Sequence, residues 1–254
     1  MILAIDMGNT NIVVGGIDEN NTYFLERVLT RTDSTALEWA LTFNDLFGFV
    51  GYKPEDFEGA IMASVVPQAN KAVLSGLTKV LGYTPINVTY DMNSGLKYGT
   101  DNPSETGPDL IAGMVAAMNE YPLPLAVIDL GTATTISIVD SDCTFQGAVI
   151  HPGIKKSLSA MTDSASLLPK IDISHIESAL GRNTIDCMKS GVLYGHAGMI
   201  DGCLNNIEKE LGYKLNVIAT GGLAGYVAEL CEHDIVVDST LLLKGLLILY
   251  NMNK

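Results

Sequence analysis

The chain has 254 residues, of which 47% are hydrophobic and 17% are charged. This apolar content is enough for a packed core, so the composition excludes an intrinsically disordered chain, and the length allows one or two domains. The 29 acidic residues outnumber the 15 basic ones, and the net charge of −14 argues against a nucleic-acid partner. Arginine occurs three times, so a phosphorylated ligand would be held by backbone N–H groups, metal ions and a few lysines.

The chain opens with an apolar run that ends at Asp6 and has no basic segment before it. We therefore predict a β-strand here rather than a signal peptide. No apolar stretch reaches the ~20 residues of a membrane span, so no membrane association is expected. The four cysteines lack CxxC spacing, which favours buried, reduced thiols in a cytoplasmic protein; they are Cys143, Cys187, Cys203 and Cys231.

Two segments of the chain resemble each other. ILAIDMGNTNIVVGGI at residues 2–17 and LAVIDLGTATTISIVD at residues 125–140 are each an apolar run that ends in aspartate, followed by a glycine turn and a second β-rich run. The two aspartates, Asp6 and Asp129, are 123 residues apart, close to half the chain. This repeat indicates a duplication, with two domains that open on the same hairpin.

The expected domains are residues 1–121 and 122–254, because the prolines of the segment 121–124 end the preceding helix. In the first half we expect a strand at 23–29, a helix capped by Asp33 or Ser34 that ends near Phe49, a strand at 60–66, a helix opened by Pro67, a loop at 91–103 and a helix at about 104–120. In the second half we expect a strand at 143–150, a long helix from Thr184 to about Leu211, a strand at 215–219 closed by Gly221-Gly222, and terminal helices. This order predicts an α/β fold with a partly antiparallel sheet in each half.

Four glycines of the long helix follow the helical period and form one stripe, at positions 191, 195, 198 and 202. Each glycine costs a helix up to ~1 kcal/mol, so close approach of another backbone would explain them. Two partners remain open: a neighbouring helix of the same domain, or a second subunit.

Three glycine turns have the residues needed to bind phosphates and a nucleoside. Asp6-Met7-Gly8-Asn9-Thr10 and Asp129-Leu130-Gly131-Thr132 each follow a buried strand, where glycine lets backbone N–H groups face a ligand and the aspartate can hold Mg²⁺. The third turn, Ala219-Thr220-Gly221-Gly222, lies between a strand and a helix, where its backbone can approach a flat ligand. Each turn alone could be an ordinary loop, but the repeated aspartate suits a metal–triphosphate clamp.

In this order the three turns resemble the phosphate-1, phosphate-2 and adenosine motifs of the sugar kinase/actin/chaperone ATPase superfamily. The set DMGNT, NPSETGPD, DLGTATT, GAVIHPGI, GRNT, SGVLYG and ATGG further resembles the type III pantothenate kinases, from residue 2 to about 250. That resemblance implies two duplicated actin-like (ribonuclease H-like) domains with mixed sheets flanked by helices and a cleft between them. It also implies a homodimer that uses ATP to phosphorylate pantothenate to 4′-phosphopantothenate, the first step of coenzyme A biosynthesis.

The resemblance also implies roles for individual residues. Asp109 matches the catalytic aspartate, although from the residues alone it could equally be a carboxylate that favours a helix start. The residues implied to bind ATP are Asp6, Met7, Gly8, Asn9, Thr10, Asn11, Ile12, Val13, Thr132, Gly221 and Gly222. Those implied on the pantothenate side are Thr100, Gly107, Pro108, Asp109, Leu110 and Thr184, the last of which could instead be a helix N-cap. Asp6 is expected near Mg²⁺, and Asp129 near a monovalent cation, K⁺ or NH₄⁺.

Two positions depart from the family pattern. The family usually has arginine where Leu110 stands and tyrosine where Thr100 stands, and leucine can supply neither the charge nor the hydrogen bonds of arginine. Two alternatives to a pantothenate kinase therefore stay open: a nucleotide-binding regulatory relative with an altered acceptor site, or a superfamily kinase for another small substrate.

Overall fold

The structure, a computed structural model, describes residues 1–165 and 167–254. The chain divides into two compact units. The first consists of residues 1–96, 101–116 and 241–254, and the second of residues 97–100 and 117–240. The C-terminal helix thus contacts the first sheet, whereas the expected domain limits, 1–121 and 122–254, stay a prediction.

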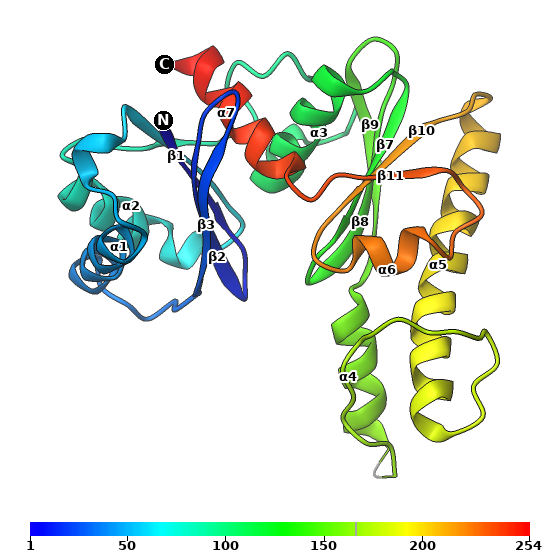
Figure 1. The fold of residues 1–254 in the computed structure, drawn as a ribbon. Helices are drawn as coiled ribbons and strands as arrows, with labels where there is room; N and C mark the ends of the chain where they lie inside the picture. Colours follow the sequence, from blue (N-terminus) through cyan, green and yellow to red (C-terminus); the bar gives the residue numbers. More distant parts are fainter. Residues whose placement is uncertain (166) are drawn as a thin grey trace. The chain divides into compact units, whose positions relative to one another are not determined.

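The first unit is built on a five-stranded mixed sheet with the order β3-β2-β1-β4-β5. Its first three strands form an antiparallel meander, and β4 and β5 add to β1 in parallel. Helices α1 and α2 lie side by side in Figure 1, and α7 packs against β1 and β4. The strands are β1 (Ile2–Met7), β2 (Asn11–Ile17), β3 (Thr22–Leu29), β4 (Gly59–Ser64) and β5 (Ile86–Asn87).

Helices α1 and α2 each bury one apolar face, as amphipathic helices on a sheet do, whereas residues 111–117 of α3 are all buried. In α1 the buried side chains Trp39, Phe43 and Phe47 follow the helical period and stack along the helix. The helices are α1 (Ala36–Val50), α2 (Pro67–Leu81), α3 (Pro108–Glu120) and α7 (Leu241–Asn253), with short 3₁₀ turns at Pro54–Asp56 and Pro103–Glu105.

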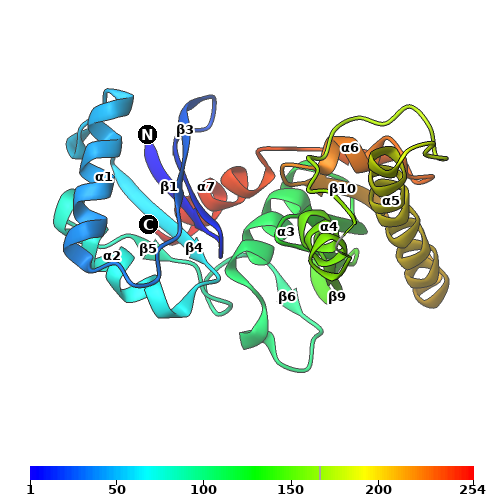
Figure 2. The same ribbon diagram turned by 90° about the horizontal axis from the view of Figure 1, so that it is seen from below.

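The second unit is built on a six-stranded mixed sheet with the order β11-β10-β7-β8-β9-β6. Strands β7, β8 and β9 form an antiparallel meander, and β10 and β11 add to β7 in parallel. The strands are β6 (Lys97–Tyr98), β7 (Leu125–Leu130), β8 (Ala133–Val139), β9 (Thr144–Pro152), β10 (Asn216–Thr220) and β11 (Ile235–Val237). The helices are α4 (Ile154–Ser164), α5 (Thr184–Leu211) and α6 (Ala224–Ala228), and α4 lies beside the first part of α5 (Figures 1 and 2).

The two sheets confirm the duplication. Apart from β6, the order β9-β8-β7-β10-β11 repeats β3-β2-β1-β4-β5 strand for strand. The burial pattern of β1 is the same as that of β7, residue for residue, and the pattern of β2 is the same as that of β8. The predicted α/β fold of two related mixed sheets flanked by helices is therefore confirmed.

The first helix starts later than predicted. Its N-cap is Thr35 rather than Asp33 or Ser34, because the Thr35 hydroxyl accepts the backbone N–H of Glu38 while the Glu38 carboxylate accepts that of Thr35. This reciprocal pair is a capping box, which satisfies two backbone donors at once.

One other helix starts later than predicted, and one has a different N-cap. Helix α3 starts at Pro108 rather than near Ser104, because residues 103–105 form a separate 3₁₀ turn and proline suits a first helical position. Helix α5 does start at Thr184, but its N-cap is Asn183, whose side chain accepts the backbone N–H of Asp186. The expected loop at 91–103 contains β6, and the two- and three-residue strands β5, β6 and β11 are too short to give a sequence pattern.

The glycine stripe of α5 is exposed. Added Cβ atoms at Gly191, Gly195, Gly198 and Gly202 would meet no atom within 4 Å outside the nearby backbone of the helix itself. Of the two open explanations, close packing against a neighbouring helix of the same unit is therefore wrong for the described chain. All four cysteines are free thiols, but none is buried as expected: Cys187 is exposed, and the other three are half-buried. Among residues 1–165 and 167–254, none of the helices has the length and apolar content to cross a bilayer.

Candidate active site

The first glycine turn joins β1 to β2. The backbone N–H of Gly8 donates to the carbonyl of Asn11 at 3.0 Å, which closes the turn and leaves the side chains of Asn9 and Thr10 exposed. Thr30, just after β3, holds the turn from outside. Its hydroxyl donates to the carbonyl of Gly8 at 2.6 Å, and its N–H donates to the carbonyl of Thr10 at 3.1 Å.

The second glycine turn joins β7 to β8 and is shorter. The N–H of Gly131 donates to the carbonyl of Ala133 at 3.0 Å, and the side chain of Thr132 is exposed. Gly153, at the start of α4, donates its N–H to the carbonyl of Thr132 at 3.2 Å. A Cβ atom on Gly153 would lie 2.5 Å from the carbonyl oxygens of Gly131 and Thr132, so glycine is required there.

The third glycine turn meets the second one directly. Gly221 has a φ of +100°, which side chains rarely adopt, and a Cβ atom on it would lie 2.6 Å from the carbonyl oxygen of Leu130. Strands β7 and β10 are parallel, with Asp129 beside Thr220, so both turns lie at the carboxyl edge of the same sheet. Gly222 is exposed and has open space around its Cα. Ligands of open α/β sheets bind at this edge.

The predicted site residues divide between the two units. Asp6 to Val13 and Gly107 to Leu110 lie in the first unit, whereas Thr100, Asp129, Thr132, Thr184, Gly221 and Gly222 lie in the second. Within the second unit, the structure brings Asp129, Thr132 and Gly221 together at the sheet edge. Thr184 is exposed in the first turn of α5. The N-cap of this helix is Asn183 and not Thr184, for which that role was the alternative to substrate binding.

Some residues predicted to bind ATP have side chains in the core. Met7 and Ile12 are fully buried in the first hydrophobic cluster, beside Leu3 and Phe43. Their side chains therefore stabilise the hairpin, and any contact they make with a ligand comes from the backbone.

Asp109 lies in the first turn of α3. Its Oδ1 accepts the backbone N–H of Leu110 at 2.8 Å. Burial raises the pKa of this carboxyl above its usual value, even though the N–H of Leu110 works in the opposite direction. A Cβ atom on Gly107 would lie 2.5 Å from Oδ1 of Asp109, so glycine at 107 leaves room for the carboxylate. A half-buried carboxylate with a raised pKa is a better proton acceptor than a fully solvated one.

Thr100 is the other predicted residue with a distinctive environment. Its hydroxyl is buried and, among the described residues, makes no hydrogen bond. Thr100 follows β6, which pairs with β9 at the edge of the second sheet. A buried hydroxyl without a partner is costly, and a polar ligand group could supply that partner.

A buried histidine of the second unit, His196, was not among the predicted site residues. Nε2 of His196, on α5, lies 2.7 Å from the hydroxyl of Thr134, at the start of β8. His151 packs edge-on against the His196 ring, with the ring centroids 5.2 Å apart. Burial, and to a smaller extent His151, lowers the pKa of His196 to about 4, so its ring is neutral at pH 7. A histidine within a run of small residues on the long helix was the available signal.

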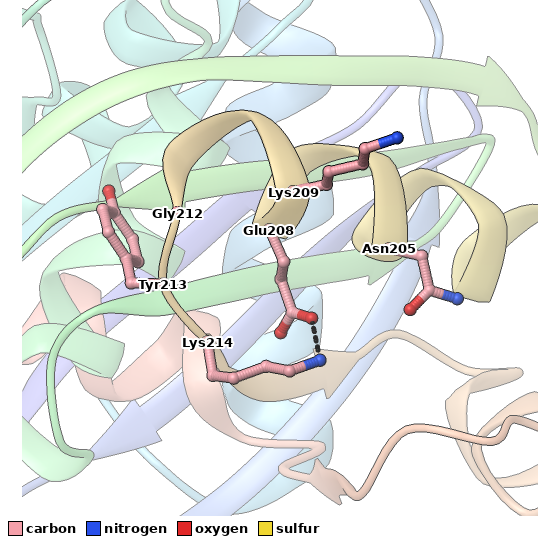
Figure 3. A pocket seen from close by; sticks show the side chains of 6 residues that line it. All are labelled: Asn205, Glu208, Lys209, Gly212, Tyr213 and Lys214. Carbon is pink, nitrogen blue, oxygen red and sulfur yellow. Dashed lines mark hydrogen bonds and ion pairs between the residues drawn. The ribbon is translucent and has the colours of Figure 1, made fainter.

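A separate surface pocket lies at the C-terminal end of α5 (Figure 3). It has a volume of about 370 Å³, and in it Glu208 and Lys214 form an ion pair of 2.5 Å. None of the predicted site residues lines it, so it is separate from the glycine turns. The lining residues are Asn205, Glu208, Lys209, Gly212, Tyr213 and Lys214.

The chain has clear relatives among known proteins. A family model described as type III pantothenate kinase matches residues 2–206. The chain is 38% identical over 253 residues to the type III pantothenate kinase of Halalkalibacterium halodurans, and 37% identical over 254 residues to that of Exiguobacterium sibiricum; both alignments cover 100% of each chain. In fold it is similar to component A of (R)-2-hydroxyglutaryl-CoA dehydratase from Acidaminococcus fermentans, with a TM-score of 0.58 and 14% identity over 98% of this chain and 96% of that one. The chain belongs to the type III pantothenate kinase family.

Proposed function

We propose that this protein transfers the γ-phosphoryl group of ATP to the primary hydroxyl of pantothenate, giving 4′-phosphopantothenate for coenzyme A synthesis. The observation that carries the proposal is Asp109. Asp109 is half-buried in the first turn of α3, the pKa of its carboxyl is raised, and it stands in a chain of this kinase family.

In the proposed reaction Asp109 accepts the proton of the pantothenate hydroxyl. The hydroxyl oxygen forms a bond to the γ-phosphorus of ATP, and the bond between that phosphorus and the bridging oxygen of the β-phosphate breaks. ADP leaves with the bonding electron pair. The N–H of Leu110 orients Oδ1 of Asp109, which leaves its other oxygen for the substrate proton.

The three glycine turns would hold the nucleotide. Asn9, Thr10 and Thr132 have exposed side chains that can donate to phosphate oxygens, and Gly222 has open space for a ribose or base. Glycine turns are suited to phosphate because N–H groups can approach it without a side chain in between. This arrangement explains how a protein with three arginines binds a triphosphate.

Cations complete the proposed nucleotide site. Asp6 and Asp129 occupy equivalent places, one residue before the ends of β1 and β7, and we propose Mg²⁺ near Asp6 through water and K⁺ or NH₄⁺ near Asp129. The described residues contain no cluster of three His, Cys, Asp or Glu side chains that could hold a metal, so a bound Mg²⁺ would take further ligands from water and phosphate. When bound, these cations would neutralise charge that develops on the phosphoryl group.

The two residues that depart from the family pattern, Leu110 and Thr100, both belong to the proposed pantothenate side. Leu110 offers an apolar surface where the family usually has arginine, and the unpartnered hydroxyl of Thr100 offers a hydrogen bond. We propose that Thr100 binds a polar group of pantothenate and that Thr184 contributes a second hydroxyl.

We further propose that the protein is a cytoplasmic homodimer. The exposed glycine stripe of α5 lets another backbone approach closely. In a twofold symmetric dimer the same surface of both subunits meets, so the stripe of one α5 would pack against the stripe of the other. Free thiols and ATP as the phosphoryl donor suit the cytoplasm.

Coupled ADP release tests the proposed activity. Wild-type protein is assayed with ATP and Mg²⁺, with and without pantothenate, in K⁺ and in Na⁺ buffers. We expect turnover that requires pantothenate and is higher in K⁺. Nucleotide binding without pantothenate-dependent turnover would favour a regulatory relative, and turnover with a different small alcohol would favour a kinase of another substrate.

A further inference from the structure

The hydrogen bond between His196 and Thr134 lies in the core of the second unit. The side chain of His196 is 3% exposed and that of Thr134 is 1% exposed, and the two polar atoms are 2.7 Å apart. Burial of two polar groups has a cost that their hydrogen bond only offsets. An apolar pair would be the simpler way to fill this space, so the polar pair calls for an explanation.

The duplication supplies an internal comparison. Thr134 pairs with Leu130 across the second turn, as Ile12 pairs with Met7 across the first. Ile12 is fully buried in an apolar cluster. The same position is therefore filled by an apolar side chain in one repeat and by a bonded hydroxyl in the other.

The way each turn is held explains this difference. At the first turn, Thr30 uses both its N–H and its hydroxyl, on the carbonyls of Thr10 and Gly8. At the second turn the equivalent N–H bond comes from Gly153, which has no side chain and has no room for one. The second turn thus lacks the hydroxyl bond of the first, and the Thr134–His196 bond supplies a side-chain attachment next to it.

His151 is the second residue that contacts the His196 ring. It pairs with Thr134 across β8 and β9, its ring packs edge-on against His196, and its Nδ1 donates to the carbonyl of Pro152 at 2.9 Å. Pro152 precedes Gly153, which bonds the turn itself. The pair is therefore linked to the turn at Thr132, through Gly153, and to Thr134 just after the turn.

We propose that His196 is a positioning residue that, through Thr134, fixes the β7–β8 turn so that Gly131 and Thr132 are placed to bind the nucleotide phosphates. This inference rests on the proposed function for the identity of the ligand. It assigns His196 no contact with ATP, and it predicts that loss of the hydrogen bond weakens nucleotide binding more than pantothenate binding.

The test compares three variants. Thr134→Val keeps the shape of the side chain but removes the hydroxyl, His196→Phe removes the ring nitrogens, and His196→Gln keeps an amide that can reach the hydroxyl. For each we would measure the Kd of an ATP analogue by calorimetry, and the KM values for ATP and pantothenate. We expect the first two variants to raise the Kd and the ATP KM about tenfold, with the pantothenate KM within about twofold of wild type. We expect His196→Gln to retain most of the affinity.

Two controls separate positioning from stability. Ser190→Ala removes another buried hydroxyl of α5, which donates to the carbonyl of Ala179 rather than to β8. It should lower stability without changing the ATP KM. The double variant Thr134→Val/His196→Phe replaces both polar groups by apolar ones, which restores much of the lost stability. If the pair positions the turn, its nucleotide affinity stays low although the protein is folded.

Each outcome decides the proposal. A Kd for the analogue within about twofold of wild type in folded Thr134→Val and His196→Phe would overturn it, and so would equal rises in the KM of both substrates. If wild-type protein shows no pantothenate-dependent turnover, the proposed function fails, but the calorimetric Kd still decides whether His196 positions the turn. If His196→Phe does not fold, Thr134→Val and the rescue by His196→Gln decide it.

Discussion

Gly221 and Leu130 are in backbone contact: a Cβ atom on Gly221 would lie 2.6 Å from the carbonyl oxygen of Leu130. Leu130 is the last residue of β7, and Gly221 follows β10 with a φ of +100°. The second and third glycine turns therefore form one surface at the carboxyl edge of the second sheet, and a side chain at 221 would push them apart.

Substitution of Gly221 tests this contact. We expect Gly221→Ala to lower the free energy of unfolding by about 2 to 4 kcal/mol, because the new methyl group meets backbone atoms and the positive φ is strained. Chemical denaturation of wild type and Gly221→Ala measures this change in the free energy of unfolding. The matched control is Gly222→Ala, where the space is open, and its stability should be close to wild type. Equal losses in both variants would contradict the contact.

Asp109→Asn tests the base. We expect kcat to fall by about 10²- to 10⁴-fold, because the amide cannot accept the proton of the acceptor hydroxyl. We also expect the variant to be at least as stable as wild type at pH 7 to 8. Burial raises the pKa of Asp109 in the folded state, so its stabilising contribution is full at low pH and is lost as the pH rises through that raised pKa. Steady-state kinetics and denaturation at two pH values measure both effects.

The exposed neighbour Asp101 provides the control for this experiment. Asp101→Asn removes a carboxylate eight residues earlier, so its kcat should change by less than about twofold. A similar loss of kcat in both variants, or full activity of Asp109→Asn, would contradict the assignment of the base.

His196 predicts a specific dependence of stability on pH. Its folded-state pKa of about 4 lies below its usual value of 6.5, so the folded state prefers the neutral ring. The contribution of neutral His196 to the free energy of unfolding is fully present above about pH 6.5. It is lost as the pH falls towards 4, and the total loss is about 3 kcal/mol. Denaturation of wild type and His196→Gln between pH 7 and 4.5 should show a stability difference that narrows with acid. The control is His175→Gln at an exposed histidine, whose difference in stability from wild type should not change with pH. A difference in stability between wild type and His196→Gln that stays constant over this pH range would contradict the expectation.

The glycine stripe predicts a defect in assembly. We expect wild-type protein to have twice the 27.1 kDa chain mass by light scattering, and Gly195→Leu to dissociate at micromolar concentration, because the new side chain prevents close approach of a second α5. The control Gly48→Leu places leucine at an exposed helical glycine of α1, which has open space around it, and should remain dimeric. A monomeric wild type would rule the dimer out.

Much of the fold could be predicted from the sequence, because the same hairpin motif occurs in both halves of the chain. The hairpin of β1 and β2 recurs in β7 and β8 with the same spacing of Asp and Gly, and its first strand is a short apolar run, as buried strands are. The family assignment, drawn from motifs at intervals along the whole chain, was confirmed. The helix starts were predicted less accurately. The N-cap of α1 is Thr35 rather than Asp33, because Glu38 completes a capping box with Thr35. The Thr-x-x-Glu spacing of this capping box is present in the sequence.

The parts that could not be predicted depend on contacts between distant segments. The attachment of Thr30 to Gly8 joins residues 22 apart, and that of His196 to Thr134 joins residues 62 apart, so no local pattern reveals them. The exposure of the glycine stripe likewise follows from the packing of the sheet and not from the helix sequence. The roles of the individual site residues remain predictions for the experiments above.

Product analysis tests the central claim most directly. Wild-type protein is incubated with ATP, Mg²⁺, K⁺ and pantothenate, and the mixture is resolved by mass spectrometry. We expect 4′-phosphopantothenate and ADP in equal amounts, and neither product above background with Asp109→Asn. Release of ADP without phosphorylated pantothenate, or equal product from Asp109→Asn, would contradict the account.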